Sequence, residues 1–220
     1  MAHKNEVVRG VYRAELKSDV TDMKDCVDAI EQLQDRVDTL LTASLFQWEN
    51  TLFLYVESVG SSVPVESLLG NFNGCLKTWP SGSLEVRHWV PMMDIFHYSA
   101  PQSVEHWRRK SPVEVPYGRV IRLRPEKVSS YIFYHYQLQE EHPGRGDKYG
   151  LISIHEDLLF FYQEQPRVAE ETPAQPSLET SNTPPNWGEL MSQHFAPWAD
   201  PGEPEWRPIV LLGAVGLPTE

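Results

Sequence analysis

A hairpin-like segment that occurs twice is the feature that most constrains the fold of this chain. LFQWENTLFLYVE (Leu45–Glu57) aligns without gaps to ISIHEDLLFFYQE (Ile152–Glu164), and five of the thirteen positions are identical. The identical pairs are Glu49/Glu156, Leu52/Leu159, Phe53/Phe160, Tyr55/Tyr162 and Glu57/Glu164. Two β-rich runs joined by a short polar turn predict a β-hairpin in each copy. The chain is therefore predicted to contain two related halves.

The residues around the first copy predict the element order β-α-β-β-α-β, which is the ferredoxin-like motif. Val7–Leu16 has the β-branched content of a strand, and Thr21–Leu41 has apolar residues at the spacing of an amphipathic helix of about five turns. After the hairpin, Pro64 opens a short helix, and Leu84–Tyr98 contains the fourth strand. The first half is predicted to span residues 5–99, followed by a connector at 100–128.

The second half, residues 129–216, is predicted to repeat this order without its first helix. Tyr131–Leu138 (YIFYHYQL) takes the place of the first strand because of its aromatic content. The Gly- and Pro-rich run in Gln139–Tyr149 predicts a turn instead of a helix. Residues 167–185 are rich in Pro, Glu, Thr and Ser, which predicts a disordered insertion.

The predicted fold class is α+β, with two ferredoxin-like halves in tandem whose sheets face each other in an intrachain α+β barrel. The period of two along a strand separates two faces of Thr51–Val59. Leu52, Leu54 and Val56 are expected to face the helices of the first half. Phe53, Tyr55 and Glu57 are expected to face the interior of the barrel.

These residues resemble L-rhamnose mutarotase and its dimeric α+β-barrel relatives. The resemblance rests on the Leu-Phe-x-x-Val-Glu pattern at residues 52–57 and on the strand Met93–His97. It covers residues 5–98 and, more faintly, 129–215. The resemblance implies interconversion of the anomers of a free sugar, such as the deoxy sugar L-rhamnose, without a cofactor. It also implies a His on the first helix and a Trp pair on the second, and this sequence has neither.

Opening a sugar ring needs one group that protonates the ring oxygen and another that accepts the anomeric proton. The candidate catalytic residues are Tyr55, Glu57 and His97. The candidate substrate-binding residues are Tyr12, Trp48, Asp94, Tyr162 and Glu164. No metal site is expected. An alternative stays open, in which these residues are core aromatics and strand-end carboxylates of a non-catalytic binding or structural protein.

Composition narrows the classes of partner and compartment. The net charge of −12 argues against nucleic acid, because phosphate binding needs clustered Lys and Arg. The basic cluster Arg108-Arg109-Lys110 is interpreted as a solvated surface. The two cysteines are interpreted as reduced, buried residues, and no membrane span is predicted, so we expect a cytoplasmic protein. A monomer is favoured over a dimer if the connector covers the apolar outer face of the second half.

Overall fold

The computed structural model describes residues 6–20, 22–70, 72–82, 85–200 and 205–218, without the side chains of residues 34, 67 and 68. Thr21, the predicted start of the first helix, lies outside these residues. The fold is mixed α+β, and its described strands form two five-stranded antiparallel sheets. The chain divides into two compact units. Unit 1 contains Met1–Met92, Pro101–Pro116 and Val210–Glu220, and unit 2 contains Met93–Ala100 and Tyr117–Ile209.

The sheet of unit 1 has the strand order β10-β2-β3-β1-β4. Its strands are β1 (Val7–Glu15), β2 (Leu40–Trp48), β3 (Thr51–Val59), β4 (Val90–Pro91) and β10 (Val210–Val215). The predicted hairpin at residues 45–57 is present, because β2 and β3 pair from Trp48↔Thr51 outward. The helices of this unit are α1 (Lys24–Glu31), α2 (Leu33–Arg36), α3 (Val65–Leu68), α4 (Val104–Trp107) and the 3-10 turn η1 (Asn73–Cys75).

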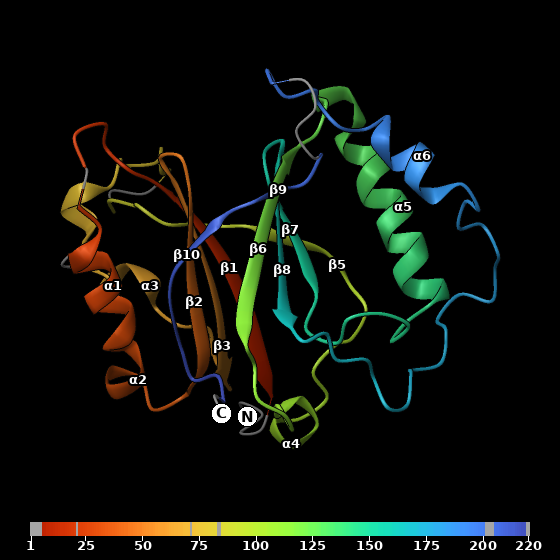
Figure 1. The fold of residues 1–220 in the computed structure, drawn as a ribbon, viewed down its shortest axis with the longest axis horizontal. Coiled ribbons are helices and arrows are strands. Elements are labelled where there is room, and N and C mark those ends of the chain that lie inside the picture. The colour runs from red at the N-terminus through yellow and green to blue at the C-terminus, as the bar shows by residue number, and fades with distance from the viewer. Residues whose placement is uncertain (1–5, 21, 71, 83–84, 201–204, 219–220) are drawn as a thin grey trace. The chain divides into compact units, whose positions relative to one another are not determined.

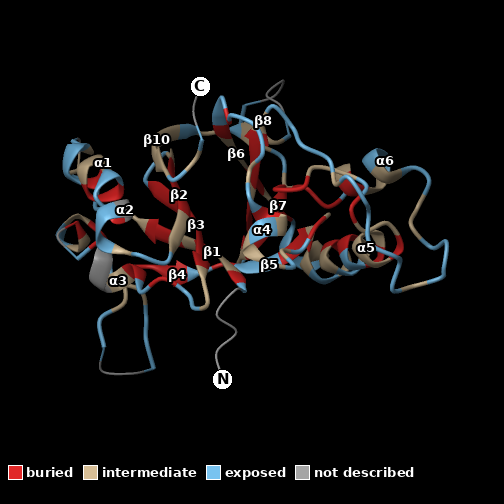
Figure 2. Cartoon of the chain, turned by 90° about the horizontal axis from the view of Figure 1, so that it is seen from below, coloured by how far each residue is buried: buried red, intermediate tan, exposed pale blue. Residues whose placement is uncertain are grey.

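Helices α1 and α2 lie along one face of this sheet (Figure 1). Their buried residues Cys26, Ile30 and Leu33 pack in one cluster with Leu52, Leu54 and Val56 of β3, which confirms the predicted helix-facing set. Figure 2 shows strands β1 to β3 largely buried and the outer sides of α1 and α2 exposed. The helical segment is shorter than predicted. Leu40 already pairs with Ser58, so pairing in the sheet ends the helical run before Leu41.

The sheet of unit 2 has the strand order β5-β7-β8-β6-β9. Its strands are β5 (Met93–His97), β6 (Val115–Arg122), β7 (Leu151–His155), β8 (Leu158–Gln165) and β9 (Arg207–Pro208). Its helical elements are η2 (Pro125–Lys127), α5 (Val128–Glu141) and α6 (Trp187–Ser192). Two predictions fail here. The predicted connector contains the strand β6, and the predicted strand Tyr131–Leu138 belongs to the helix α5.

Helix α5 also overturns the prediction that the second half lacks its first helix. Tyr131 and His135 are buried at helical spacing, whereas Phe133 and Tyr136 are more than half exposed. Tyr131 packs in one cluster with Leu159 and Met191, and Phe161 packs against that cluster. Burial of one helical face against the sheet has therefore outweighed the β propensity of this aromatic run. The apolar face of β8 is covered by α5 and not by the predicted connector.

Each unit contains a strand from the other half of the sequence. Strand β4 pairs with β1 in unit 1, but after Met92 the chain continues as β5, which pairs with β7 in unit 2. In the same way β9 pairs with β6, and β10 pairs with β2. The compact units therefore do not follow the sequence divisions 5–99, 100–128 and 129–216. Those divisions stay a prediction about the repeat.

The residues 167–185 contain no helix or strand, and they are anchored at the end of α5. The Glu140 carbonyl accepts hydrogen bonds from the backbone N–H groups of Ser177 and Leu178. The Glu141 carboxylate accepts from the backbone N–H groups of Asn182 (2.7 Å) and Thr183 (2.8 Å). Disorder in this segment stays a prediction. Among the described residues, no helix has the length and apolarity that crossing a membrane requires.

Candidate functional site

Glu57 on β3 is a buried carboxylate of unit 1 with several hydrogen-bond donors around it. Its side chain is completely buried, and it accepts hydrogen bonds from three other residues. Tyr55 Oη and Trp107 Nε1 donate to Glu57 Oε1, the latter at 2.8 Å. Arg109 binds both oxygens, with Nη2 at 2.9 Å from Oε1 and Nη1 on Oε2. This is a bidentate ion pair inside the protein, the geometry that the planar guanidinium favours.

Two segments far apart in sequence build this ion pair. The period of two along β3 places Tyr55 and Glu57 on the face opposite the helices. Trp107 and Arg109 come from α4 and the turn that follows it. Ser103 caps α4, because its Oγ accepts a hydrogen bond from His106 N at 3.1 Å.

Sequence reasoning missed Trp107 and Arg109, because it interpreted the basic cluster at residues 108–110 as a solvated surface. A buried Glu needs a cation. Arg109 is 52 residues away from Glu57 in the sequence, so only the tertiary structure identifies the pair.

The environment fixes the protonation states of Tyr55 and Glu57. Burial by itself would raise the pKa of Glu57, but the Arg109 guanidinium and the hydrogen bonds to the carboxylate bring the pKa below its usual value. Burial and the neighbouring Glu57 charge raise the pKa of Tyr55 well above its usual value. Glu57 is therefore a carboxylate and Tyr55 a phenol at neutral pH. A general base needs a pKa near the working pH, so this environment suits a fixed ion pair better than proton transfer.

A cavity of about 400 Å³ adjoins this ion pair within unit 1. It lies among the first residues of β2, the α4 segment and the residues after β10. Its lining residues are Leu41, Val104, Trp107, Arg108, Arg109, Gly216, Leu217 and Pro218. The lining of the cavity therefore combines apolar side chains with two arginines.

The other predicted residues of unit 1 are not among the residues that line this cavity. Tyr12 on β1 is partly buried and packs against the core that α1 and β3 share, and burial raises its pKa. Trp48 is partly buried at the end of β2. Their predicted roles in sugar binding therefore gain no support from the cavity.

The remaining predicted residues belong to unit 2, where they form two separate pairs. His97 Nδ1 lies 2.9 Å from Asp94 Oδ2, and both side chains are partly exposed on or beside β5. Tyr162 Oη donates to Glu164 Oε1 at 2.9 Å, repeating the Tyr55–Glu57 contact of unit 1. The predicted catalytic set is therefore divided between the units: Tyr55 and Glu57 are in unit 1, and His97 is in unit 2.

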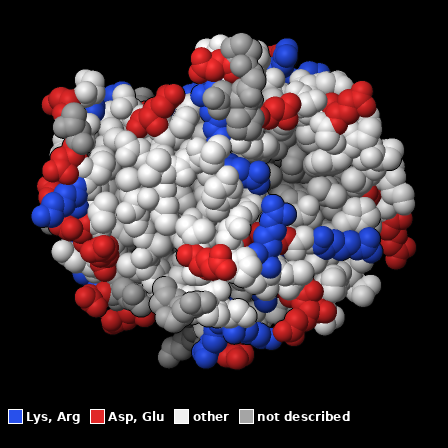
Figure 3. Space-filling model, viewed as in Figure 1, with Lys and Arg blue, Asp and Glu red and all other residues white. Residues whose placement is uncertain are grey.

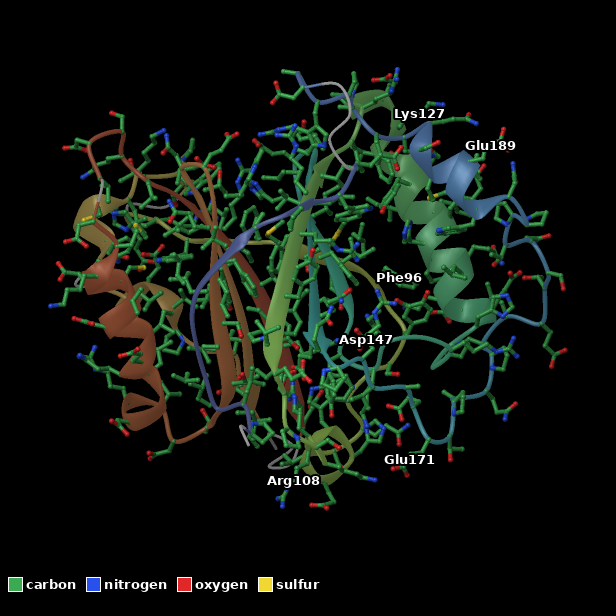
Figure 4. The ribbon with its side chains drawn as sticks, in the orientation of Figure 1. Phe96, Arg108, Lys127, Asp147, Glu171 and Glu189 are labelled. Carbon is green, nitrogen blue, oxygen red and sulfur yellow. The ribbon has the colours of Figure 1, made fainter. Side chains whose placement is uncertain are left out.

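Asp147 of unit 2 has a carboxyl group with a raised pKa. Burial raises its pKa to about 6, and the Glu164 charge adds to this effect, although Arg167 and hydrogen bonds from the Tyr149 and Gly150 N–H groups oppose it. Its Oδ2 is buried and has no hydrogen-bond partner among the described residues. Figure 4 labels Asp147 in the loop before β7. Sequence reasoning interpreted Arg145-Gly146-Asp147 only as a turn.

Metal ligation has little support in the described part of the chain. No three His, Cys, Asp or Glu side chains there lie close enough together to hold an ion. His135 is buried between Phe96 and Trp187, and burial lowers its pKa to about 4. It is therefore a neutral core residue of unit 2.

Comparisons with known proteins give similar solved structures only. A scan of protein-family models gives no match, and a search of curated proteins gives none. A candidate monooxygenase from Fusobacterium nucleatum is 9% identical, with a TM-score of 0.44, over 95% of this chain and 94% of that chain. A candidate monooxygenase from Lactobacillus acidophilus is 6% identical, with a TM-score of 0.39, over 96% and 98%. An anthrone oxidase-like protein is 7% identical, with a TM-score of 0.39, over 100% and 98%.

These findings correct the expected resemblance to L-rhamnose mutarotase. The similar structures are described as monooxygenases and as an oxidase-like protein, and none of the three is a mutarotase. The predicted sugar mutarotase or isomerase function is therefore wrong. The Leu-Phe-x-x-Val-Glu pattern behind the mutarotase prediction is short and unspecific, because any buried strand that ends in a carboxylate can carry it. The identities and TM-scores of these three structures transfer no activity to this chain.

Proposed function

We propose that unit 1 binds a small apolar carboxylate in the cavity beside Arg108 and Arg109. The observation that carries the proposal is the lining of this cavity, which combines Leu41, Val104 and Leu217 with two arginines. No Asp or Glu is among its described lining residues. Cavities for small molecules are mostly apolar, with a few polar groups that fix the ligand's orientation.

The two arginines have different parts in this proposal. Arg109 is held by buried Glu57, so it and Trp107 form a rigid wall that needs no rearrangement when a ligand binds. Arg108 is largely exposed, and Figure 4 shows its side chain pointing outward near α4. Its contact with Glu105 is 3.6 Å long between exposed groups, and such pairs contribute little. The Arg108 guanidinium is therefore accessible to a ligand carboxylate.

The test compares two ligands of equal length, decanoate and decanol, by isothermal titration calorimetry. We expect saturable binding of decanoate, with decanol at least about tenfold weaker, a difference of about 1.4 kcal/mol. Arg108→Gln is expected to remove most of this preference without changing the binding of decanol. Val104→Trp is expected to weaken both ligands by filling the cavity.

Lys110→Gln is the matched control, because Lys110 is the next exposed cation but does not line the cavity. Equal affinity for decanoate and decanol would show that the cavity does not select a carboxylate. A decanoate affinity that neither Arg108→Gln nor Val104→Trp reduces would place the binding elsewhere. Circular dichroism of each variant separates these results from misfolding.

We also infer that the chain is a duplication of a ferredoxin-like unit. Three observations support this inference: the strand orders β4-β1-β3-β2 and β9-β6-β8-β7 correspond, a helix follows β1 and β6, and both hairpins turn at a Glu with positive φ. Those turn residues are Glu49 (φ 52°) and Glu156 (φ 59°), a conformation that non-glycine residues seldom adopt. A crystal structure in which residues 6–98 and 115–215 do not superpose would contradict the inference. The intrachain barrel stays a prediction.

A further inference from the structure

Arg119 on β6 is a half-buried cation in an aromatic environment within unit 2. Its Cζ lies 4.7 Å from the ring centroid of Phe161, 5.8 Å from that of Tyr117 and 5.9 Å from that of Trp206. Its Nη2 donates to Gln163 Oε1 at 3.3 Å, which is a weak, neutral hydrogen bond. The rings hold the guanidinium in place but do not neutralise its charge.

No carboxylate in the described part of the chain pairs with Arg119. Its Nε is buried and lacks a hydrogen-bond partner there. Burial, with a smaller effect from Arg167, lowers the pKa of Arg119, so the site makes its charge unfavourable. A buried donor without a partner is destabilising, and natural proteins usually avoid it. An anion at this position would remove that cost.

Arg167 provides a second positive charge near Arg119. It follows the end of β8, which is the neighbour of β6 in this sheet. Its charge contributes to the lowered pKa of Arg119, so the two guanidinium groups are near enough to interact. Two neighbouring cations repel each other, and arginine pairs are suited to phosphate.

We propose that unit 2 binds a small aromatic phosphate monoester beside Arg119. Its dianionic phosphate would lie between Arg119 and Arg167, and its ring would pack against Tyr117 and Trp206. The charge of Asp147 and that of Arg167 attract each other. The ligand therefore competes with Asp147 for Arg167 but has no acidic competitor for Arg119 among the described residues.

The experiment measures phenyl phosphate binding to the full chain by isothermal titration calorimetry at constant ionic strength. We expect Arg119→Gln to weaken binding at least about tenfold and Arg167→Gln to weaken it about threefold. Arg119→Lys keeps the charge but loses the planar fork, so we expect an intermediate loss. Arg122→Gln is the matched control, because Arg122 is on the same strand but pairs with Asp157 at 2.8 Å.

Three further binding measurements test the chemistry of the ligand and the location of the site. Inorganic phosphate should bind more weakly than phenyl phosphate, because it lacks the ring, and benzyl alcohol should not bind. Lys110→Gln should leave phenyl phosphate binding unchanged, since Lys110 belongs to unit 1 and does not line its cavity. Equal affinity of the wild type and Arg119→Gln, or the absence of saturable binding, would overturn the proposal. Equal affinity for phosphate and phenyl phosphate would overturn its aromatic part.

Discussion

Each unit has an arginine beside the sheet that contains its hairpin, but the two arginines have opposite environments. In unit 1, Arg109 forms a bidentate ion pair with completely buried Glu57, within a frame that also contains Tyr55 and Trp107. In unit 2, Arg119 lies among aromatic rings and has no acidic partner in the described part of the chain. A paired arginine contributes to the structure, whereas an arginine that is half-buried and unpaired has donors left for a ligand. The difference shows that the environment of an arginine, and not its place beside a hairpin, decides whether it is neutralised by the protein itself.

The surface charge does not reveal this difference. Figure 3 shows acidic and basic side chains in small groups over the visible face, without a broad basic field. Charge counted along the sequence likewise placed Arg109 in a solvated cluster. Only the burial and the partners of each guanidinium distinguish the two arginines.

The largest effect that we expect is from breaking the ion pair of unit 1. Arg109→Met leaves Glu57 buried without its cation, which costs about 3–5 kcal/mol of folding free energy. Urea unfolding followed by circular dichroism measures this loss. Arg108→Met is the control, because Arg108 is exposed and its removal should change stability by less than about 0.5 kcal/mol. Equal effects of the two substitutions would show that the buried pair has no special role.

A smaller effect is expected from the Tyr–Glu contact that both units share. Tyr55→Phe and Tyr162→Phe each remove one hydrogen bond to a carboxylate, a loss of about 1.5–3 kcal/mol. If the duplication preserved the function of this contact, the two losses should agree to within about 0.5 kcal/mol. A large loss in one unit and none in the other would break the correspondence between Glu57 and Glu164.

A still smaller, pH-dependent effect is expected from Asp147. Its pKa in the folded protein, about 6, lies above its ordinary value, so the folded state holds this proton more tightly than the unfolded chain. The resulting stabilisation is complete below about pH 4 and is lost as the pH rises through 6. Asp147→Asn should therefore raise the melting temperature at pH 7.5 more than at pH 5. The corresponding gain in the free energy of unfolding is less than about 1 kcal/mol, because the group is partly solvated. An equal change at both pH values would contradict the shifted pKa.

The most local effect concerns the segment that is anchored to α5. We expect limited proteolysis to cut the wild type first within residues 168–183, and to cut Glu141→Gln there severalfold faster. The substitution removes the charge that Asn182 and Thr183 bind. Glu140→Gln is the control, since Glu140 holds Ser177 and Leu178 through its backbone carbonyl. Equal cleavage rates for the two variants would show that the carboxylate does not anchor the segment.

The monomer stays a prediction, now for a different reason. The apolar face of β8 that needed a cover is packed against α5 and α6 of the same chain, so no second chain is required there. Sedimentation equilibrium should give a mass near 25.3 kDa. A mass of twice this value would require an apolar surface elsewhere, and exposed Phe133 and Tyr136 of α5 would be the first residues to examine.

The sequence by itself determined the local elements whose patterns agree with their surroundings. The repeated hairpins, the first strand and the faces of β3 follow from alternation and turn residues, because a half-buried strand imposes a period of two. Tertiary structure decided the rest. Tyr131–Leu138 is a helix because one face packs on a sheet, which local propensity cannot indicate. The placement of β5 in unit 2 and of β10 in unit 1 depends on pairing between strands that are far apart in the sequence. The partner of Glu57 depends on a segment fifty residues away, brought close only when the sheet and α4 pack together.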